Sequence, residues 1–429
     1  MKLLFFSLSA AASGETFIGL SLAEQLRRAG VESHFVHPPV TSGAVEHFGF
    51  DHTVVDYADC PKGPSARAFV DELVASVAPD AIVLCDYNVF IRNVRFHFQL
   101  DPVFIDDYGL PVLPVDLMEW EDTDFEIDLC GAPPLPVDRG ILAYPAHLRP
   151  VPPLHLDRGG STRALPYRVV APESVDPATS ARIRADLGLG GRDRLVMLPV
   201  SAWQRPPGGR GLWSDMMTTL TDHVPDLVVR YLGRLPEHVH FLVIGQAPPA
   251  FDRLPAGRLH VRPPCAIDRY TEYLGASDAV VLLSPPSVTG ARAVLMDKPV
   301  LIMQNRFPVR DGAELAAVAA EVDLTPFVRD WLAATGPIDR FRMWPKGSFR
   351  ALDAVFTAND YTNALITTEL LDETGTVRAL HDLVAGPDDP SGAAERLAKS
   401  RARYLEAVAA LPDAVEVIRE AVGRGPARR

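Results

Sequence analysis

Short apolar runs alternate with amphipathic stretches along the first third of the chain. The runs predict buried parallel strands, which fall at residues 3–7, 31–37, 81–85 and 103–105. The stretches between them place apolar residues on one helical face, at residues 16–29 and 65–78. Strands that alternate with helices of this length are typical of a doubly wound parallel sheet.

The first apolar run has a second interpretation. Residues 1–14 contain one lysine, a short apolar core and small residues, as a signal peptide does. We favour a buried strand because the following segment continues the strand–helix–strand pattern directly.

A second alternation begins after a proline-rich, irregular region at 110–177. Strands are predicted at 195–200, 240–244, 259–261, 279–283 and 299–303. Helices are predicted at 212–220, 227–235, 267–274, 287–296 and, beyond a mostly helical region from 315, at 393–422. The sequence thus predicts an α/β fold of two doubly wound, Rossmann-like domains that face a central cleft. We expect them at residues 1–175 and 190–392, with a helical segment at 393–429.

Composition agrees with this organisation and excludes some partners. A chain of 429 residues is long enough for two domains. Its net charge of −13 argues against a nucleic-acid partner, and no apolar run approaches the roughly 20 residues of a membrane span. The four cysteines form no CxxC pair, which predicts neither a disulfide framework nor a zinc site. We therefore expect a cytoplasmic protein that binds small molecules, and a homodimer stays open.

Ligands of such sheets bind beyond the carboxyl ends of the strands, so the loops there are the candidate sites. Glu15 follows the first strand and a small-residue loop, in the first turn of a predicted helix. Its carboxylate is either a helix-capping group or a catalytic base.

In the second domain a Gly- and Pro-rich loop begins at Ser201 and carries Arg205 and Arg210. Two arginines at the carboxyl end of a strand suit a lid over phosphate groups, and a mobile surface loop is the alternative.

Two further positions in this domain suit a phosphorylated donor. Gly245 ends a strand, where it lets a ligand approach the backbone. The turn that contains Ser284, Ser287, Thr289 and Gly290 joins a strand to a helix, whose free N–H groups attract a diphosphate. Ser287 is alternatively only the N-cap of that helix.

Several segments resemble the GT-B glycosyltransferases, and the resemblance covers most of the chain. Residues 14–32 resemble the first loop and helix of that family, where a Gly-His pair opens a helix with a Leu-Ala-x-x-Leu-x-x-x-Gly run. Residues 241–245, 279–283 and 299–301 resemble its donor-binding half.

Three positions depart from the pattern of the family. Glu15 stands where the family commonly has the His that acts as acceptor base, and a carboxylate with a raised pKa can take that role. Arg292 stands where a Glu commonly holds the donor ribose, and it could instead bind a phosphate or carboxylate of an unusual donor. Ser284-Pro285-Pro286 replaces the usual His-Gly-Gly.

The resemblance implies a metal-independent transfer of a sugar from a nucleoside-diphosphate sugar to a natural-product acceptor, with no cofactor other than this co-substrate. Glu15 would be the base. Arg205 or Arg210, together with Ser287, would stabilise the leaving group. The acceptor would lie near residues of the first domain, namely Ser13, Gly14, Tyr87, Tyr108 and Trp120. Core packing is the alternative for the three aromatic residues.

The departures keep two other functions open. One is a GT-B-like enzyme with different chemistry, such as an epimerase or an enzyme that uses another activated donor. The other is a non-catalytic accessory homologue that acts on a partner enzyme.

Overall fold

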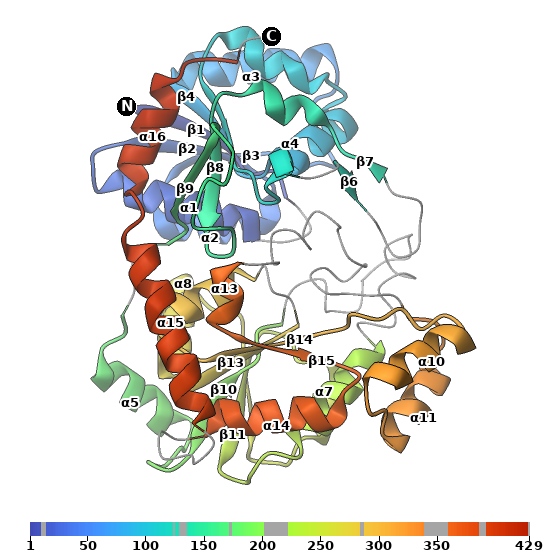
Figure 1. The fold of residues 1–429 in the computed structure, drawn as a ribbon. Helices are drawn as coiled ribbons and strands as arrows, with labels where there is room; N and C mark the ends of the chain where they lie inside the picture. Colours follow the sequence, from blue (N-terminus) through green and yellow to red (C-terminus); the bar gives the residue numbers. More distant parts are fainter. Residues whose placement is uncertain are drawn as a thin grey trace.

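The computed structural model describes residues 1–9, 14–122, 125–127, 135–170, 174–200, 222–283, 287–338, 359–385 and 392–427. Two parallel sheets, one from each half of the chain, form two lobes that lie one above the other in Figure 1. The α/β class and the doubly wound arrangement predicted from the sequence are confirmed.

The sheet of the first lobe has five parallel strands in the order β3-β2-β1-β4-β5. Their bounds are β1 Lys2–Phe6, β2 Glu32–His37, β3 Asp51–Val54, β4 Ala81–Leu84 and β5 Val112–Pro114. The central strand β1 is almost wholly apolar and buried, and its Phe5 ring stacks on Phe35 of β2 at 4.7 Å. The first apolar run is therefore a core strand, as predicted.

The helices of the first lobe include α1 Gly14–Arg27, α2 Ser42–Phe48, α3 Pro64–Val77 and α4 Tyr87–Asn93. The predicted strand at 103–105 is wrong, because these residues form a 3-10 helix, Pro102–Tyr108. Pro102 fixes a helical φ at its start, the Asp101 side chain accepts the N–H of Val103, and Gly109 ends it at φ 65°. The fifth strand lies slightly later, at β5.

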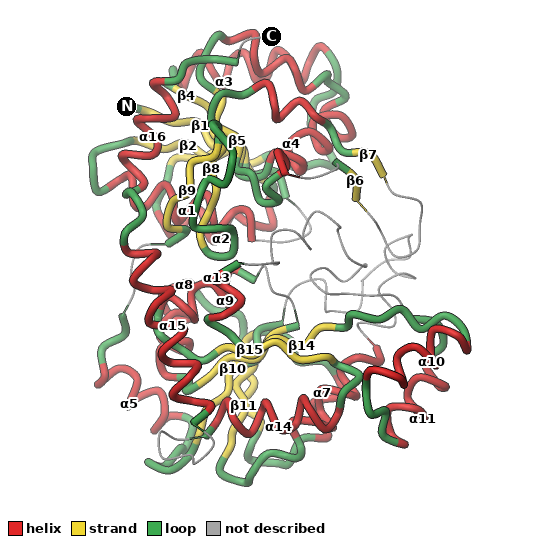
Figure 2. Tube along the Cα trace, in the orientation of Figure 1, coloured by secondary structure: helices red, strands yellow, loops and turns green. Residues whose placement is uncertain are grey.

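The region at 110–177 is less irregular than predicted. Figure 2 shows further strands there, which are β6 Glu126–Ile127, β7 Leu135–Pro136, β8 His147–Val151 and β9 Ala164–Arg168. Strands β8 and β9 pair in parallel, and Leu148 of β8 bridges to Val115, just after β5. Pro150 and Pro166 lie inside these strands and interrupt the strand pattern in the sequence.

The sheet of the second lobe has six parallel strands in the order β12-β11-β10-β13-β14-β15. Their bounds are β10 Arg194–Met197, β11 Val239–Ile244, β12 Leu259–Arg262, β13 Ala279–Leu282, β14 Val300–Gln304 and β15 Ile366–Glu369. The first five were predicted. The edge strand β15 was not, because its sequence Ile-Thr-Thr-Glu is largely polar.

The remaining helices cover the second lobe and connect it to the first. They are α5 Pro177–Asp186, α7 Val224–Leu232, α8 Ile267–Ala276, α9 Val288–Leu295, α10 Gly312–Glu321, α11 Pro326–Thr335, α13 Asp360–Asn363, α14 Glu373–Val384, α15 Ala393–Ala409 and α16 Ala414–Gly423. The helix predicted at 212–220 lies outside the described residues.

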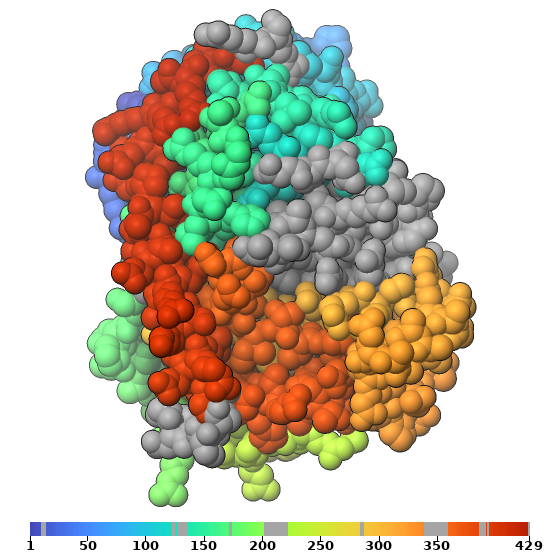
Figure 3. Space-filling model, viewed as in Figure 1, coloured from blue at the N-terminus to red at the C-terminus, as the bar shows by residue number. Residues whose placement is uncertain are grey.

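The chain ends by crossing back to the first lobe. Helix α15 packs on α9, α13 and α14 of the second lobe, whereas α16 packs on α1 and β9 of the first. The predicted helix at 393–422 is thus divided, at Pro412, and the Asp413 side chain caps α16. Figure 3 shows these two helices, in red, along one edge of both lobes.

Candidate functional site

Two helix N-termini meet where the lobes join. Helix α1 begins at Gly14 after β1, and helix α9 begins at Val288 after β13. A Cβ atom built on Gly14 would lie 3.8 Å from Cγ2 of Val288, so the two first turns are in contact. Because each N-terminus carries unpaired N–H groups and a partial positive charge, this junction is suited to an anionic ligand.

Glu15 lies in the first turn of α1 at this junction. Its side chain is partly buried, and its Oε2 atom is enclosed without a hydrogen-bond partner among the described residues. Burial, and then the charge of Asp86, raise the pKa of Glu15 to about 7, against smaller opposing effects of its own backbone N–H, Ser9 and Arg92. The carboxyl group therefore changes its protonation near neutral pH.

Asp86 is a functional candidate that the sequence reasoning missed. It follows β4, the strand next to β1, and its side chain accepts the N–H of Val89 at 2.9 Å as the N-cap of α4. Burial raises the pKa of Asp86 to about 6, opposed chiefly by backbone N–H groups. Its position directly after the apolar run at 81–85 was the available signal, since β1 and β4 end at the same edge of the sheet.

Close packing holds the start of α1 against this edge. The hydroxyl groups of Ser7 and Thr16 form a buried hydrogen bond of 2.7 Å between the end of β1 and α1. A Cβ atom on Gly19 would lie 2.5 Å from Sγ of Cys85, so only glycine allows this approach. Cys85 immediately precedes Asp86, and the same contact therefore brings α1 to the Asp86 strand end.

Another acidic residue, with no exposed surface, follows the next strand of the sheet. Asp116, just after β5, has no exposed surface, and neither has His147, while Arg149 is 1% exposed. Oδ2 of Asp116 lies 3.5 Å from Nε of Arg149 and 3.9 Å from Nδ1 of His147, and Asp116 also accepts the N–H of Trp120 at 3.2 Å. The buried carboxyl group of Asp116 is thus paired with the buried guanidinium of Arg149.

The aromatic residues predicted at an acceptor site make core contacts. Tyr87 and Trp120 are each 1% exposed within the same apolar cluster, where the Tyr87 hydroxyl donates to Asp138 at 3.0 Å. Tyr108 packs at the edge of that cluster, and its hydroxyl donates to Asp71 at 2.7 Å. These contacts agree with core packing, the alternative stated for them, whereas Gly14 lies at the junction itself.

The predicted phosphate turn caps helix α9. The Ser287 side chain accepts the N–H of Gly290 at 3.4 Å, and the Thr289 hydroxyl bonds to Tyr270 at 2.9 Å. A Cβ atom on Gly290 would lie 2.6 Å from Leu282, so the glycine allows α9 to lie against β13. Gly245 ends β11 with φ 97°, a conformation that glycine readily adopts.

Arg292 lies on α9 one turn further into the helix and is 5% exposed. Its guanidinium donates to the Thr271 hydroxyl of α8. It also borders a pocket of about 90 Å³ between α1 and the second lobe, together with Phe17, Ser21 and Ile267. Arg292 is thus placed near the junction but already has a polar partner.

The other predicted site residues lie outside the described residues, and they are Ser13, Ser201, Arg205, Arg210 and Ser284. Within the described residues, no group of three or more His, Cys, Asp or Glu side chains could hold a metal ion. In that same part of the chain, no helix has both the length and the apolar character to cross a membrane.

Two doubly wound lobes with a site at their junction define the GT-B fold, and solved structures of this fold match the whole chain. The spinosyn forosaminyltransferase SpnP has a TM-score of 0.56 at 15% identity, and the glycosyltransferase VinC, in complex with dTDP, has 0.55 at 14%. Each match covers 99% of both chains. Anabaena HepE, in complex with UDP-glucose, has a TM-score of 0.51 at 12% identity, over 99% of this chain and 98% of HepE.

The chain belongs to the family of unknown function DUF6365, whose model matches residues 22–427. No curated protein has a matching sequence. The GT-B fold predicted from the resemblance is confirmed. Sequence identities of 12–15% show a shared fold and nothing beyond it.

Proposed function

We propose that this chain is a metal-independent glycosyltransferase that moves a sugar from a nucleoside-diphosphate sugar to a small natural-product acceptor, with Glu15 as the base. The observation that carries the proposal is the Glu15 carboxyl group, whose pKa is raised to about 7 and whose Oε2 atom lacks a described partner. It lies at the contact of two helix N-termini, one from each lobe. A general base acts best when its pKa is near the working pH.

In this proposal the ionised Glu15 accepts the proton of an acceptor hydroxyl group. The hydroxyl oxygen attacks the anomeric carbon, and the bond from that carbon to the diphosphate breaks. Proton uptake removes the repulsion between Glu15 and Asp86, so the acidic neighbour favours this step. The position of Asp86, just after the strand that pairs with β1, supports its role as a positioning partner of Glu15.

The leaving diphosphate gains negative charge as the bond breaks. The N-terminus of α9 supplies unpaired N–H groups and the Ser287 and Thr289 hydroxyls, and fixed dipoles of this kind stabilise a developing anion. Arg292, which lies on α9, would bind an additional phosphate or carboxylate group of the donor.

Solved structures of the same fold support these classes of donor and acceptor. VinC is solved with dTDP, and the spinosyn rhamnosyltransferase SpnG is solved with thymidine diphosphate and with the spinosyn aglycone. A nucleoside diphosphate on the second lobe and a hydrophobic acceptor on the first lobe are therefore the substrates that we propose here.

The proposal is tested by thermal unfolding with a panel of nucleoside diphosphates, with and without magnesium. One nucleotide at 100 times its dissociation constant should stabilise the native protein by about 2.7 kcal/mol, independently of magnesium. Ser287→Ala should lose this shift. Asp311→Ala, which removes the N-cap of α10 instead, is the matched control and should keep it.

A flat response across the panel would contradict the proposal. It would favour another activated donor or a non-catalytic accessory role, the alternatives stated for this sequence.

A further inference from the structure

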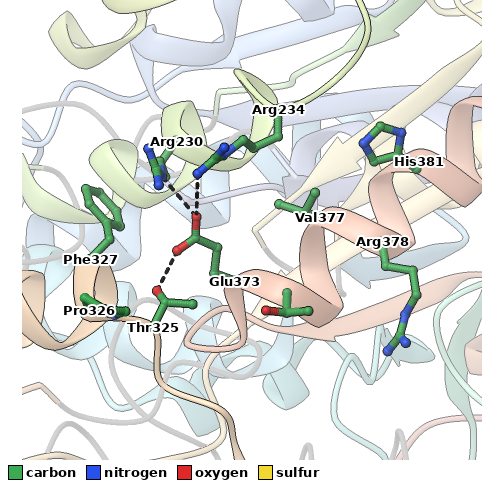
Figure 4. Close-up of a pocket in the computed structure, with 10 residues that line it drawn as sticks. Arg230, Arg234, Thr325, Pro326, Phe327, Glu373, Val377, Arg378 and His381 are labelled. Atoms are coloured by element: carbon green, nitrogen blue, oxygen red, sulfur yellow. Dashed lines mark hydrogen bonds and ion pairs between the residues drawn. The ribbon is translucent and has the colours of Figure 1, made fainter.

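A groove on the second lobe lies apart from the helix termini of the candidate active site. Its volume is about 770 Å³, and its walls come from α7, α11 and α14 (Figure 4). No residue of α1, α4 or α9 lines it. The groove therefore includes neither Glu15 nor Ser287.

Arginines dominate the charge of this groove. Arg230 lies on α7 and Arg234 lies two residues beyond its end, and both approach Oε1 of Glu373, at 3.0 and 3.8 Å. Arg378 on α14 adds a third positive charge. Three guanidinium groups and one carboxylate leave a net charge of +2, in a chain whose net charge is −13. Such a patch attracts anions.

Glu373 fixes the arginines without using all of their donors. Its side chain is 9% exposed, and the Thr325 hydroxyl donates to Oε2 at 2.6 Å. The side chains of Arg230 and Arg234 remain 39% and 52% exposed. Since a guanidinium has five N–H donors, both groups can bind an anion while Glu373 holds them in place.

One wall of the groove is apolar. The guanidinium of Arg230 lies over the Phe327 ring at 4.9 Å, and Pro326 and Val377 extend this surface. In Figure 4 the Phe327 ring stands beside Arg230, and Val377 lies between Glu373 and Arg378. The wall can therefore cover the apolar body of a ligand whose anionic end meets the arginines.

We propose that this groove binds an organic phosphate, a dianion joined to an apolar or aromatic body. The dianion matches the net charge of +2, and guanidinium groups bind phosphate through paired N–H donors. The Phe327 wall distinguishes such a ligand from inorganic phosphate. The site is independent of the proposed glycosyl transfer.

The test is calorimetric titration of the full chain with phenyl phosphate. We expect saturable binding, weakened by about tenfold in Arg234→Gln and in Arg378→Gln, because each variant loses a charge-assisted hydrogen bond. Arg253→Gln removes an equal charge from an exposed pair with Asp226 and should bind as the unaltered protein does. Inorganic phosphate and benzoate should bind more weakly than phenyl phosphate.

A second titration separates this groove from the donor site. Ser287→Ala, which alters the proposed diphosphate site at the N-terminus of α9, should leave the dissociation constant of phenyl phosphate unchanged. Loss of phenyl phosphate binding in Ser287→Ala, absence of saturation, or equal affinity in all three arginine variants would each overturn the proposal.

Discussion

Two sets of carboxyl groups lie at the same edge of the first sheet, and they differ in whether a cation lies close to them. Glu15 and Asp86 follow the adjacent strands β1 and β4, and burial raises their pKa values to about 7 and about 6. Asp116, just after the next strand, has the guanidinium of Arg149 at 3.5 Å and a histidine at 3.9 Å. Burial raises the pKa of Asp116 as well, and the charges of Arg149 and His147 oppose this shift, so the two sets differ in the cation beside the carboxyl group and not in the effect of burial.

The difference indicates which acidic residue is suited to the proposed chemistry and which one stabilises the fold. A permanently charged arginine that is 1% exposed needs a counter-ion, so Asp116 serves the stability of the lobe. The effect of burial on Glu15 is opposed by its own backbone N–H, by Ser9 and, less, by the charge of Arg92, and its pKa still lies near neutral pH, as is common for groups at functional sites.

The largest effect should follow from Glu15→Gln, which removes the proposed base and keeps its shape. We expect glycosyl transfer to fall by about 10²–10⁴-fold, the usual contribution of general base catalysis. The thermal stability should not fall, since the amide imitates the protonated acid. Transfer rates and unfolding curves of the same preparation check both expectations.

The control for this variant is Glu72→Gln, at an exposed position of α3. It should retain activity. Full activity of Glu15→Gln would show that Glu15 is not the base. The two acidic sets would then not differ in function.

Arg149→Met should produce the largest loss of stability. It leaves Asp116 buried without its cation, which costs about 3–5 kcal/mol of the free energy of unfolding. The double variant Asp116→Asn with Arg149→Met should recover much of this loss, because no unpaired charge remains. Urea unfolding followed by circular dichroism measures both.

Arg158→Met is the matched surface change, since Arg158 pairs with exposed Glu420 at 3.3 Å. It should change the free energy of unfolding by about 1 kcal/mol or less. If Arg149→Met had as small an effect, Asp116 would not depend on its cation, and the two acidic sets would be alike.

The strands and helix that carry these carboxyl groups were predicted from the sequence better than the contacts of the groups themselves. Apolar periodicity located β1, β4 and α1, and the loop composition singled out Glu15. Asp86 was missed because its importance depends on Glu15, which is 71 positions away in the chain. The two residues follow β1 and β4, which are neighbours only in the folded sheet. Asp116 was not singled out, because it falls in the region at 110–177 that was predicted to be irregular, and proline-containing β8, which supplies Arg149, was not predicted.

The pH dependence of stability should separate the two sets further. The folded-state pKa of Glu15 lies near 7, above its ordinary value of 4.5, so the folded protein binds a proton more tightly than the unfolded chain. Stability from this group is complete below about pH 4.5 and is lost as the pH rises through 7. Glu15→Gln should therefore exceed the unaltered protein in stability at pH 8, by at most about 3 kcal/mol, and match it at pH 4. A gain that did not vary with pH would mean that ionisation of Glu15 is not its source.

Asp86→Asn should have the smallest effect and should test the pairing itself. Asparagine still caps α4, but it removes a negative charge beside Glu15, so the pKa of Glu15 should fall. The acid limb of kcat/KM, set by ionisation of the base, should then move to lower pH by on the order of one unit. Asp138→Asn, which changes a surface-facing N-cap paired with Arg95, should leave the limb in place. An unchanged limb in Asp86→Asn would mean that burial alone sets the proton affinity of Glu15, and Asp86 would then be a helix cap, structural in the same sense as Asp116.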